Sequence, residues 1–214
     1  RLGGRNVLND ISFQASRGEI IAIAGVNGAG KSTLARMLCG LQKNGSGTVL
    51  WTGKPMSRRL RRKKAYMVMQ DVGHQLFTDS VAAECALGIK APNKDEIDRT
   101  LEKVDLLAYK ERHPLSLSGG QMQRLAVVVS DICGKELLVF DEPTSGLDLK
   151  SMEEVGILTR SLATQGKVLL IITHDIEFMM RICTRILFIR DGEIMKDLSG
   201  GQKEKIVRLL RGEE

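Results

Sequence analysis

The segment GVNGAGKST, from Gly25 to Thr33, constrains the fold of this chain more than any other. It matches G-x-x-x-x-G-K-[ST], the phosphate-binding loop of nucleotide triphosphatases, and we call it the phosphate loop. The apolar run Ile20–Ala24 precedes it and predicts a buried strand, whereas Lys31–Leu41 has leucines at helical spacing and predicts a helix. A chance match is the alternative, but this strand and helix are the context that the motif requires, so we expect nucleotide binding.

The physical basis of the motif is an unobstructed backbone beside a helix start. Glycine lacks a Cβ, so successive N–H groups can point at an anion, and the following helix adds its free N–H groups and the positive end of its dipole. Lys31 is expected to lie against the β- and γ-phosphates, and the Ser32 hydroxyl to bind Mg²⁺. The expected nucleotide-binding residues of the loop are Asn27, Gly28, Ala29, Gly30, Lys31, Ser32 and Thr33.

Composition narrows the class of protein. With 214 residues, 43% apolar and 27% charged, the chain has the size and composition of one globular domain. No apolar run approaches the roughly 18 residues that a membrane-spanning helix needs. The four cysteines form no C-x-x-C pair, which argues against a zinc site or a disulfide framework and suits a reducing cytoplasm. The net charge of +6 suits an anionic ligand, and we expect no nucleic-acid partner.

Buried strands alternate with helices along the chain, which predicts an α/β fold with a mainly parallel sheet and helices on both faces. The expected strands are Val7–Leu8, Ile11–Phe13, Ile20–Ala24, Gly47–Trp51, Tyr66–Met69, Leu137–Phe140, Val168–Ile172, Ile186–Ile189 and Glu193–Met195. The expected helices are Lys31–Leu41, Val81–Leu87, Asp95–Leu107, Gly119–Val129, Leu149–Gln165 and Ile206–Leu210. Ligands of such sheets bind at the carboxyl ends of strands, where Gln70, Asp141 and His174 would converge with the phosphate loop.

The run RRLRRKK, from Arg58 to Lys64, holds six basic residues in seven. We interpret it as a solvated loop or strand edge. The alternative is a patch that faces phosphate or lipid.

The run LVFDE, from Leu138 to Glu142, is a second nucleotide signal, because a buried strand delivers two carboxylates to the edge that holds the phosphate loop. Neighbouring side chains of a strand point in different directions. Asp141 is therefore expected to help hold Mg²⁺, and Glu142 to polarise the attacking water. A helix-capping Asp-Glu pair before Pro143 is the alternative.

A third signal is LSGGQ, from Leu117 to Gln121. The chain resembles the ATP-binding subunits of ABC transporters over essentially its whole length. Six motifs occur in the order and at the spacing of that family: the phosphate loop, Gln70, LSGGQ, LVFDE, the turn SGLD (Ser145–Asp148) and His174. The resemblance implies a phosphate-loop NTPase with a mainly parallel core sheet, a small antiparallel β subdomain and a helical subdomain. It implies a single domain over residues 1–214, with its core at 1–70 and 134–214 and its helical subdomain at 71–133.

The same resemblance implies an ATPase that uses ATP and Mg²⁺ and works as a head-to-tail pair of domains. Each nucleotide would lie between the phosphate loop of one domain and the LSGGQ of a second. His174 would contact the γ-phosphate in cis, although a lone histidine after a strand is more often structural, and Gln70 would reach Mg²⁺ or the attacking water. The residues expected to act across the pair are Ser118, Gly119, Gly120, Gln121 and Asp148.

Two features depart from the family pattern. The family stacks an aromatic residue on adenine, and by spacing that residue would fall immediately before Arg1; the chain has no aromatic residue before Phe13, so this stacking is expected to be lost. The pentapeptide LSGGQ also occurs a second time, at Leu198–Gln202, where the family has no signature, and we interpret this copy as coincidence.

The run QDVGHQLFTDSV, from Gln70 to Val81, is similar to a segment of the energy-coupling-factor importers of vitamins, cobalt and nickel. Gln75, Leu76 and Phe77 would then line a groove for a membrane subunit, with ordinary packing as the alternative. This resemblance implies a second ATPase domain and integral membrane subunits as partners, at the cytoplasmic face of the membrane. The competing hypothesis is a soluble ABC-type ATPase of translation or DNA repair.

Overall fold

The fold is built on one six-stranded sheet, seen in a computed structural model that describes residues 7–42 and 46–199 together with residues 202, 205 and 208. The strands lie in the order β4-β5-β6-β1-β7-β8, and all neighbours are parallel except β7 and β8, which form an antiparallel hairpin. Their bounds are β1 Ile20–Ala24, β4 Ala65–Val68, β5 Leu137–Asp141, β6 Val168–Ile172, β7 Arg185–Arg190 and β8 Glu193–Ser199. The prediction of a mainly parallel core sheet is confirmed.

A separate two-stranded antiparallel sheet is formed by β2 (Leu50–Trp51) and β3 (Lys54–Pro55). Thr52 and Gly53 join the two strands with positive φ angles of 48° and 77°, as a tight two-residue hairpin turn requires. The small antiparallel part of the predicted fold is therefore present.

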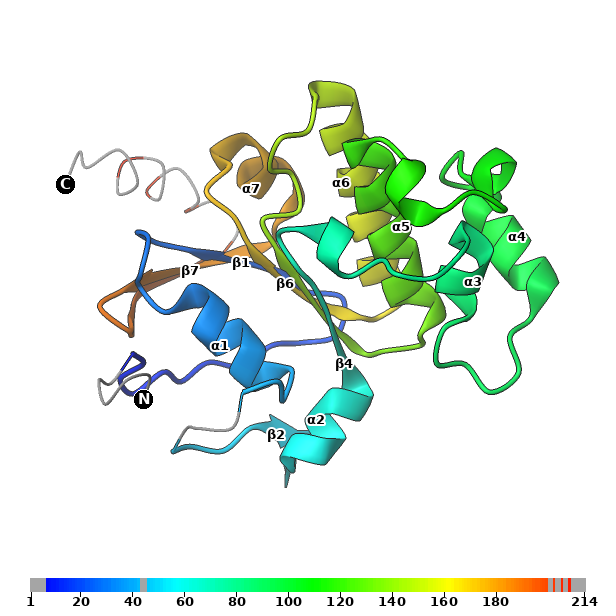
Figure 1. Cartoon of the computed structure of the whole chain (residues 1–214). Coiled ribbons are helices and arrows are strands. Elements are labelled where there is room, and N and C mark those ends of the chain that lie inside the picture. The colour runs from blue at the N-terminus through cyan, green and yellow to red at the C-terminus, as the bar shows by residue number, and fades with distance from the viewer. Residues whose placement is uncertain (1–6, 43–45, 200–201, 203–204, 206–207, 209–214) are drawn as a thin grey trace.

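Helices cover both faces of the six-stranded sheet (Figure 1). The α-helices are α1 Lys31–Leu38, α2 Arg58–Lys64, α3 Val81–Ala86, α4 Lys94–Glu102, α5 Gly119–Ile132, α6 Leu149–Thr164 and α7 Ile176–Ile182. Short 3₁₀ helices lie at η1 Val72–His74, η2 Leu107–Tyr109 and η3 Pro114–Ser116. The helix predicted over 95–107 thus ends at Glu102, with a separate 3₁₀ turn after it.

The alternation of side chains along the strands divides the core into two layers. In β1, Ile21 and Ile23 pack with Leu34 and Ala35 of α1 on one face of the sheet. On the other face, Ile20 and Ala22 share a buried cluster with residues of α5, α6 and α7, among them Phe178. Because both faces are covered, the strands read as continuous apolar runs, which is why their positions were predictable.

A third buried cluster lies among α3, α4 and α5, away from the central sheet, and we call it the helical cluster. Leu101, Leu106 and Leu125 of α5 are fully buried within it, and Tyr66 of β4 packs against it. The helical part of the predicted fold is therefore also present.

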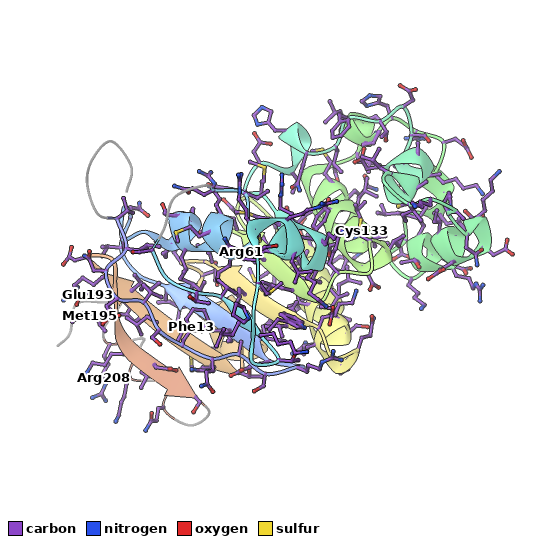
Figure 2. All side chains as sticks on the ribbon, turned by 90° about the horizontal axis from the view of Figure 1, so that it is seen from below. Phe13, Arg61, Cys133, Glu193, Met195 and Arg208 are labelled. Atoms are coloured by element: carbon purple, nitrogen blue, oxygen red, sulfur yellow. The ribbon has the colours of Figure 1, made fainter. Side chains whose placement is uncertain are left out.

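The interpretation of Arg58–Lys64 as a loop or strand edge is wrong, because this run is the helix α2. Ser57 starts the helix by accepting a hydrogen bond from the Leu60 N–H at 3.2 Å. Arg58 Nε donates to the Gly40 carbonyl at 2.8 Å, and Arg61 donates to the Met37 carbonyl. Figure 2 shows Arg61 beside α1. These arginines cap the carbonyl end of α1, where cations are favourable, so two of the six basic residues of the run have a structural role.

Two further features differ from the expectations. Val7–Leu8 and Ile11–Phe13 form no strand; instead Leu8, Ile11 and Phe13 pack on the α1 face of the core. Helix α7 was not expected from the sequence. The predicted helix Ile206–Leu210 lies largely outside the described residues. The second LSGGQ begins inside β8, where Leu198 is 9% exposed and belongs to the sheet core, so its first residue has a packing role.

Candidate nucleotide site

The phosphate loop joins β1 to α1 at the carboxyl edge of the sheet. Gly25 has a φ of 147°, and a Cβ there would lie 2.0 Å from the Ile189 carbonyl oxygen of β7, so only glycine fits. Gly30 occupies the N-cap of α1 with a φ of 100°, and no side chain among the described residues caps the helix. The first N–H groups of α1 are therefore left for an anion, as the motif predicts.

Lys31 is held over the loop by its own backbone. Its Nζ donates to the Gly25 carbonyl at 2.7 Å and to the Val26 carbonyl at 3.0 Å. Burial lowers the pKa of Lys31, while the nearby carboxylates of Glu142 and Asp141 act in the opposite direction. The ammonium group is thus placed inside the curl of the loop, where a phosphate would lie.

Asp141 ends β5 with its side chain buried beside the phosphate loop. Burial raises its pKa, and a hydrogen bond with the Ser32 hydroxyl partly offsets that effect. A carboxylate and a hydroxyl side by side are oxygen donors of the kind that Mg²⁺ prefers, so these residues fit the ion that the motif implies.

Glu142 follows Asp141, but its side chain points toward His174 rather than toward Ser32. Its backbone has a φ of 52°, unusual for a residue other than glycine, and its N–H donates to the Ile172 carbonyl of β6 at 2.8 Å. Its Oε1 lies 3.0 Å from Nδ1 of His174, while its Oε2 is buried and has no hydrogen-bond partner among the described residues. A buried carboxylate oxygen without a donor is suited to accept a hydrogen bond from a water molecule or substrate in the cavity.

These groups line one cavity of about 810 Å³. Its lining includes the expected residues of the phosphate loop except Ala29, and four residues from other strand ends: Asn27, Gly28, Gly30, Lys31, Ser32 and Thr33, with Gln70, Asp141, Glu142 and His174. Ala29 is buried beneath the loop. The cavity is also lined by Val7, Val26, Ile172, Phe188 and Arg190, which were not expected from the sequence. The pairing of β7 with β1 brings Phe188 and Arg190 to this edge, and a hairpin motif alone does not predict that pairing.

The LSGGQ segment does not line the cavity. Ser118 caps α5 in a reciprocal arrangement with Gln121: the Ser118 N–H donates to the Gln121 Oε1 at 2.9 Å, and the Gln121 N–H donates to the Ser118 hydroxyl at 3.3 Å. Gly119 has open space around its Cα, whereas a Cβ on Gly120 would lie 2.5 Å from the Ser151 hydroxyl of α6. The signature therefore packs on the first turn of α6.

Asp148 lies in the same neighbourhood. It is the N-cap of α6 and accepts a hydrogen bond from the Ser151 N–H at 2.8 Å, and this bond lowers its pKa. Ser118, Gly119 and Asp148 are all exposed. The sequence-predicted site residues thus form two groups within the chain: the cavity group and an exposed group around the starts of α5 and α6.

Comparisons with known proteins agree with this geometry. A family model described as "ABC transporter" matches residues 8–145. A protein of Treponema denticola named as an ABC transporter ATP-binding protein is 58% identical over 206 residues, which is 96% of this chain and 42% of the relative. A Streptomyces avermitilis protein named in the same way is 36% identical over 93% of this chain and 78% of its own length. In a second Treponema denticola relative, which is 46% identical, the match covers 39% of the relative's length. The chain therefore spans about two fifths of the length of each of these two Treponema proteins.

Solved structures give the same result. The structure of cbiO1 from Clostridium perfringens, described as part of the ABC transporter complex cbiONQ, has a TM-score of 0.80 and 31% identity, covering 96% of this chain and 86% of that one. A nucleotide-free ATP-binding cassette from an ABC transporter has a TM-score of 0.85 at 21% identity, and the match covers 97% of this chain and 90% of that one. At this identity the likeness supports the fold alone. The phosphate loop, the carboxylate pair and these matches together show that the chain is an ATP-binding domain of the ABC transporter family.

Proposed function

We propose that this chain is the ATP-hydrolysing motor of an ABC transporter. The observation that carries the proposal is the single cavity in which Lys31, Glu142 and His174 meet the open N-terminus of α1. This arrangement places a cation and backbone donors for a triphosphate on one side and a carboxylate with a free oxygen on the other. Catalysis of phosphoryl transfer consists mainly of such positioning and charge stabilisation.

Different residues of the cavity bind the triphosphate, bind the metal ion and orient the attacking water. The phosphate loop holds the triphosphate, and Ser32, Asp141 and Gln70 hold Mg²⁺. The ion, when bound, neutralises charge on the phosphates. Glu142 accepts a hydrogen bond from the attacking water through Oε2, and its contact with His174 fixes its orientation. His174, with an 80% exposed side chain, remains open toward the γ-phosphate.

The exposed group completes the site of a second domain. Ser118, Gly119 and Asp148 face solvent within one chain, which is the arrangement expected if a nucleotide on another domain covers them. Gly120 and Gln121 belong to the same group through their contacts in α5 and with α6. ATP would thereby close two domains, and hydrolysis would open them.

We further propose a single ABC ATPase domain with its core at 1–70 and 134–214 and its helical subdomain at 71–133, a division supported by the separate helical cluster. We assign it to an energy-coupling-factor type importer of a metal ion or vitamin, acting with membrane subunits at the cytoplasmic face of the membrane. The likeness to cbiO1, from the complex cbiONQ, and the Gln70–Val81 run support this assignment. No helix in the described part of the chain has the length and apolarity to cross a membrane.

The motor is tested with the isosteric Glu142→Gln variant of the full-length protein. It should bind ATP as the parent does, lose hydrolysis and accumulate as a closed pair of domains in Mg-ATP, measured by sedimentation. Glu193→Gln, on exposed β8, serves as the control and should hydrolyse normally. Unchanged hydrolysis by Glu142→Gln would show that Glu142 does not act on the attacking water.

The transport assignment is tested separately by purifying the tagged full-length protein from detergent-solubilised native membranes and identifying what accompanies it. A large membrane subunit together with a small substrate-binding membrane protein supports the importer proposal. Ribosomes or DNA-repair proteins in their place would support the soluble ABC-type ATPase instead.

A further inference from the structure

Gln75 lies at the open edge of the central sheet. Its Oε1 accepts a hydrogen bond from the Met69 N–H at 2.9 Å, and its Nε2 donates to the Met67 carbonyl at 2.6 Å. Both backbone groups belong to β4 or to the residue just after it, and β4 is the first strand of the sheet, with β5 as its partner. One side-chain amide therefore satisfies two backbone groups that no strand pairs in the described part of the chain.

The geometry of this contact reproduces a strand. On the free edge of β4, alternate residues present a carbonyl and, two residues later, an N–H, and a neighbouring strand would bond to both with the N–H and C=O of a single residue. The side-chain amide of Gln75 presents one N–H donor and one oxygen acceptor toward this edge, so it takes the place of that residue. The backbone at Met69, where the strand ends, is thereby fixed.

The residues directly after Gln75 are fixed to the helical cluster. Leu76 is 3% exposed and packs in that cluster with Val81 and Leu101. The buried carboxylate of Glu84 in α3 accepts hydrogen bonds from the N–H groups of Phe77 at 3.1 Å and Thr78 at 3.0 Å. A buried carboxylate is costly without such donors, so this anchor holds the loop firmly.

Phe77 itself is 69% exposed between these two anchors. In Figure 1 the chain leaves β4 and crosses to α3 through this segment. The backbone of the loop is therefore tied to the sheet by Gln75 and to the helices by Glu84.

Gln70 directly follows Met69 and lines the nucleotide cavity. We infer that Gln75 is a positioning residue: its amide fixes Met69 and thereby sets where Gln70 stands relative to the nucleotide, linking the helical cluster to the hydrolysis step. The inference rests on the proposed role of Gln70. A misplacement of a reacting group by about 1 Å can lower a rate about 100-fold, whereas ATP affinity, set mainly by the phosphate loop, should change little.

The test compares three variants of the full-length protein. Gln75→Met keeps the side-chain length but removes both hydrogen bonds, and Gln75→Ala repeats the loss without a long side chain. His74→Ala is the matched control, because His74 is the preceding residue and its side chain is 81% exposed, with its Nδ1 near the Asp71 carboxylate. We expect both Gln75 variants to lower kcat about 10- to 100-fold with the Kd for ATP within about twofold of the parent, and His74→Ala to match the parent.

Hydrogen exchange measures the structural premise directly. The Met69 amide should exchange at least about tenfold faster in Gln75→Met than in the parent or in His74→Ala, because it loses its acceptor. If Gln75 only stabilised the fold, its variants would lose stability or ATP affinity. They would not combine a lowered kcat with an unchanged Kd for ATP.

The double variant Gln70→Ala/Gln75→Met separates the inference from the proposed function. If Gln75 acts through Gln70, the double variant should be no slower than Gln70→Ala alone. Full kcat in Gln75→Met, or a double variant slowed by the product of the two single effects, would overturn the inference while the role of Gln70 stands. Full kcat in Gln70→Ala would overturn the role of Gln70 and this inference with it.

Discussion

The two glycines at the start of α5 should respond in opposite ways to the same added methyl group. Neither has a positive φ, and a Cβ on Gly119 would meet nothing within 4 Å. A Cβ on Gly120 would lie 2.5 Å from the Ser151 hydroxyl and 2.9 Å from the Ser151 Cβ, closer than real contacts allow. Gly119→Ala and Gly120→Ala are therefore a matched pair that differs in packing alone.

Two effects set the expected change in unfolding free energy for each alanine variant. Replacing glycine by alanine in a helix stabilises by up to about 1 kcal/mol. Overpacking a closely filled contact costs about 1–3 kcal/mol. Gly119→Ala should thus be neutral or slightly stabilising, and Gly120→Ala should be less stable than Gly119→Ala by about 1–3 kcal/mol.

Urea unfolding followed by circular dichroism measures the difference. With a slope of about 2 kcal/mol/M, the two midpoints should lie about 0.5–1.5 M apart. Ser151→Gly removes the opposing atoms, so in a double-mutant cycle it should recover about 0.5–3 kcal/mol of the Gly120→Ala loss. Equal midpoints for Gly119→Ala and Gly120→Ala, or no recovery with Ser151→Gly, would refute the packing argument.

Three other predictions follow from the described contacts. Lys31→Ala should abolish ATP binding, because it removes the ammonium group from the loop; a nucleotide titration with normal affinity would contradict this. Leu101→Ala should cost about 2–5 kcal/mol of unfolding free energy, whereas Ile157→Ala, 60% exposed on α6, should change it by less than about 0.5 kcal/mol in urea unfolding. Burial raises the pKa of the Cys39 and Cys85 thiols to about 12 from 9.0, so the neutral thiols contribute stability that is complete below pH 9 and is lost as the pH rises toward 12. Both thiols should resist an aromatic disulfide reagent at pH 8 until urea is added, and rapid native labelling of either would contradict the burial.

The strands were the most predictable part of the fold. The bounds of β1 and β6 match the expected runs, because strands buried on both faces are apolar throughout. Helix α2 was missed because it has no buried residue and hence no apolar stripe; its stability comes from Ser57 and from carbonyls of α1, distant in sequence. Helix α7 did carry a signal: Asp175 caps it by accepting from the Phe178 N–H, and the apolar Phe178, Met179 and Ile182 have helical spacing.

The candidate site was predictable where each residue follows its own strand. Lys31, Asp141 and His174 could be placed at one edge from the rule that parallel strands share their carboxyl ends. Arg190 could not, because its place in the cavity depends on β7 lying beside β1, which is a property of strand order. The hydrogen bond between Glu142 and His174 likewise depends on the neighbouring positions of β5 and β6.

The covering of β4 by a side chain has a consequence for association between molecules. A sheet ends at two strands, and an open edge is a template for pairing with another chain. At one end, β8 carries exposed Lys196 and Asp197, which discourage such pairing. At the other end, Gln75 occupies the free carbonyl and N–H of the strand edge. The residue that we assign to positioning the nucleotide site therefore also fills one position of the β4 edge at which another strand could pair, and we expect its loss to favour insoluble protein on heating.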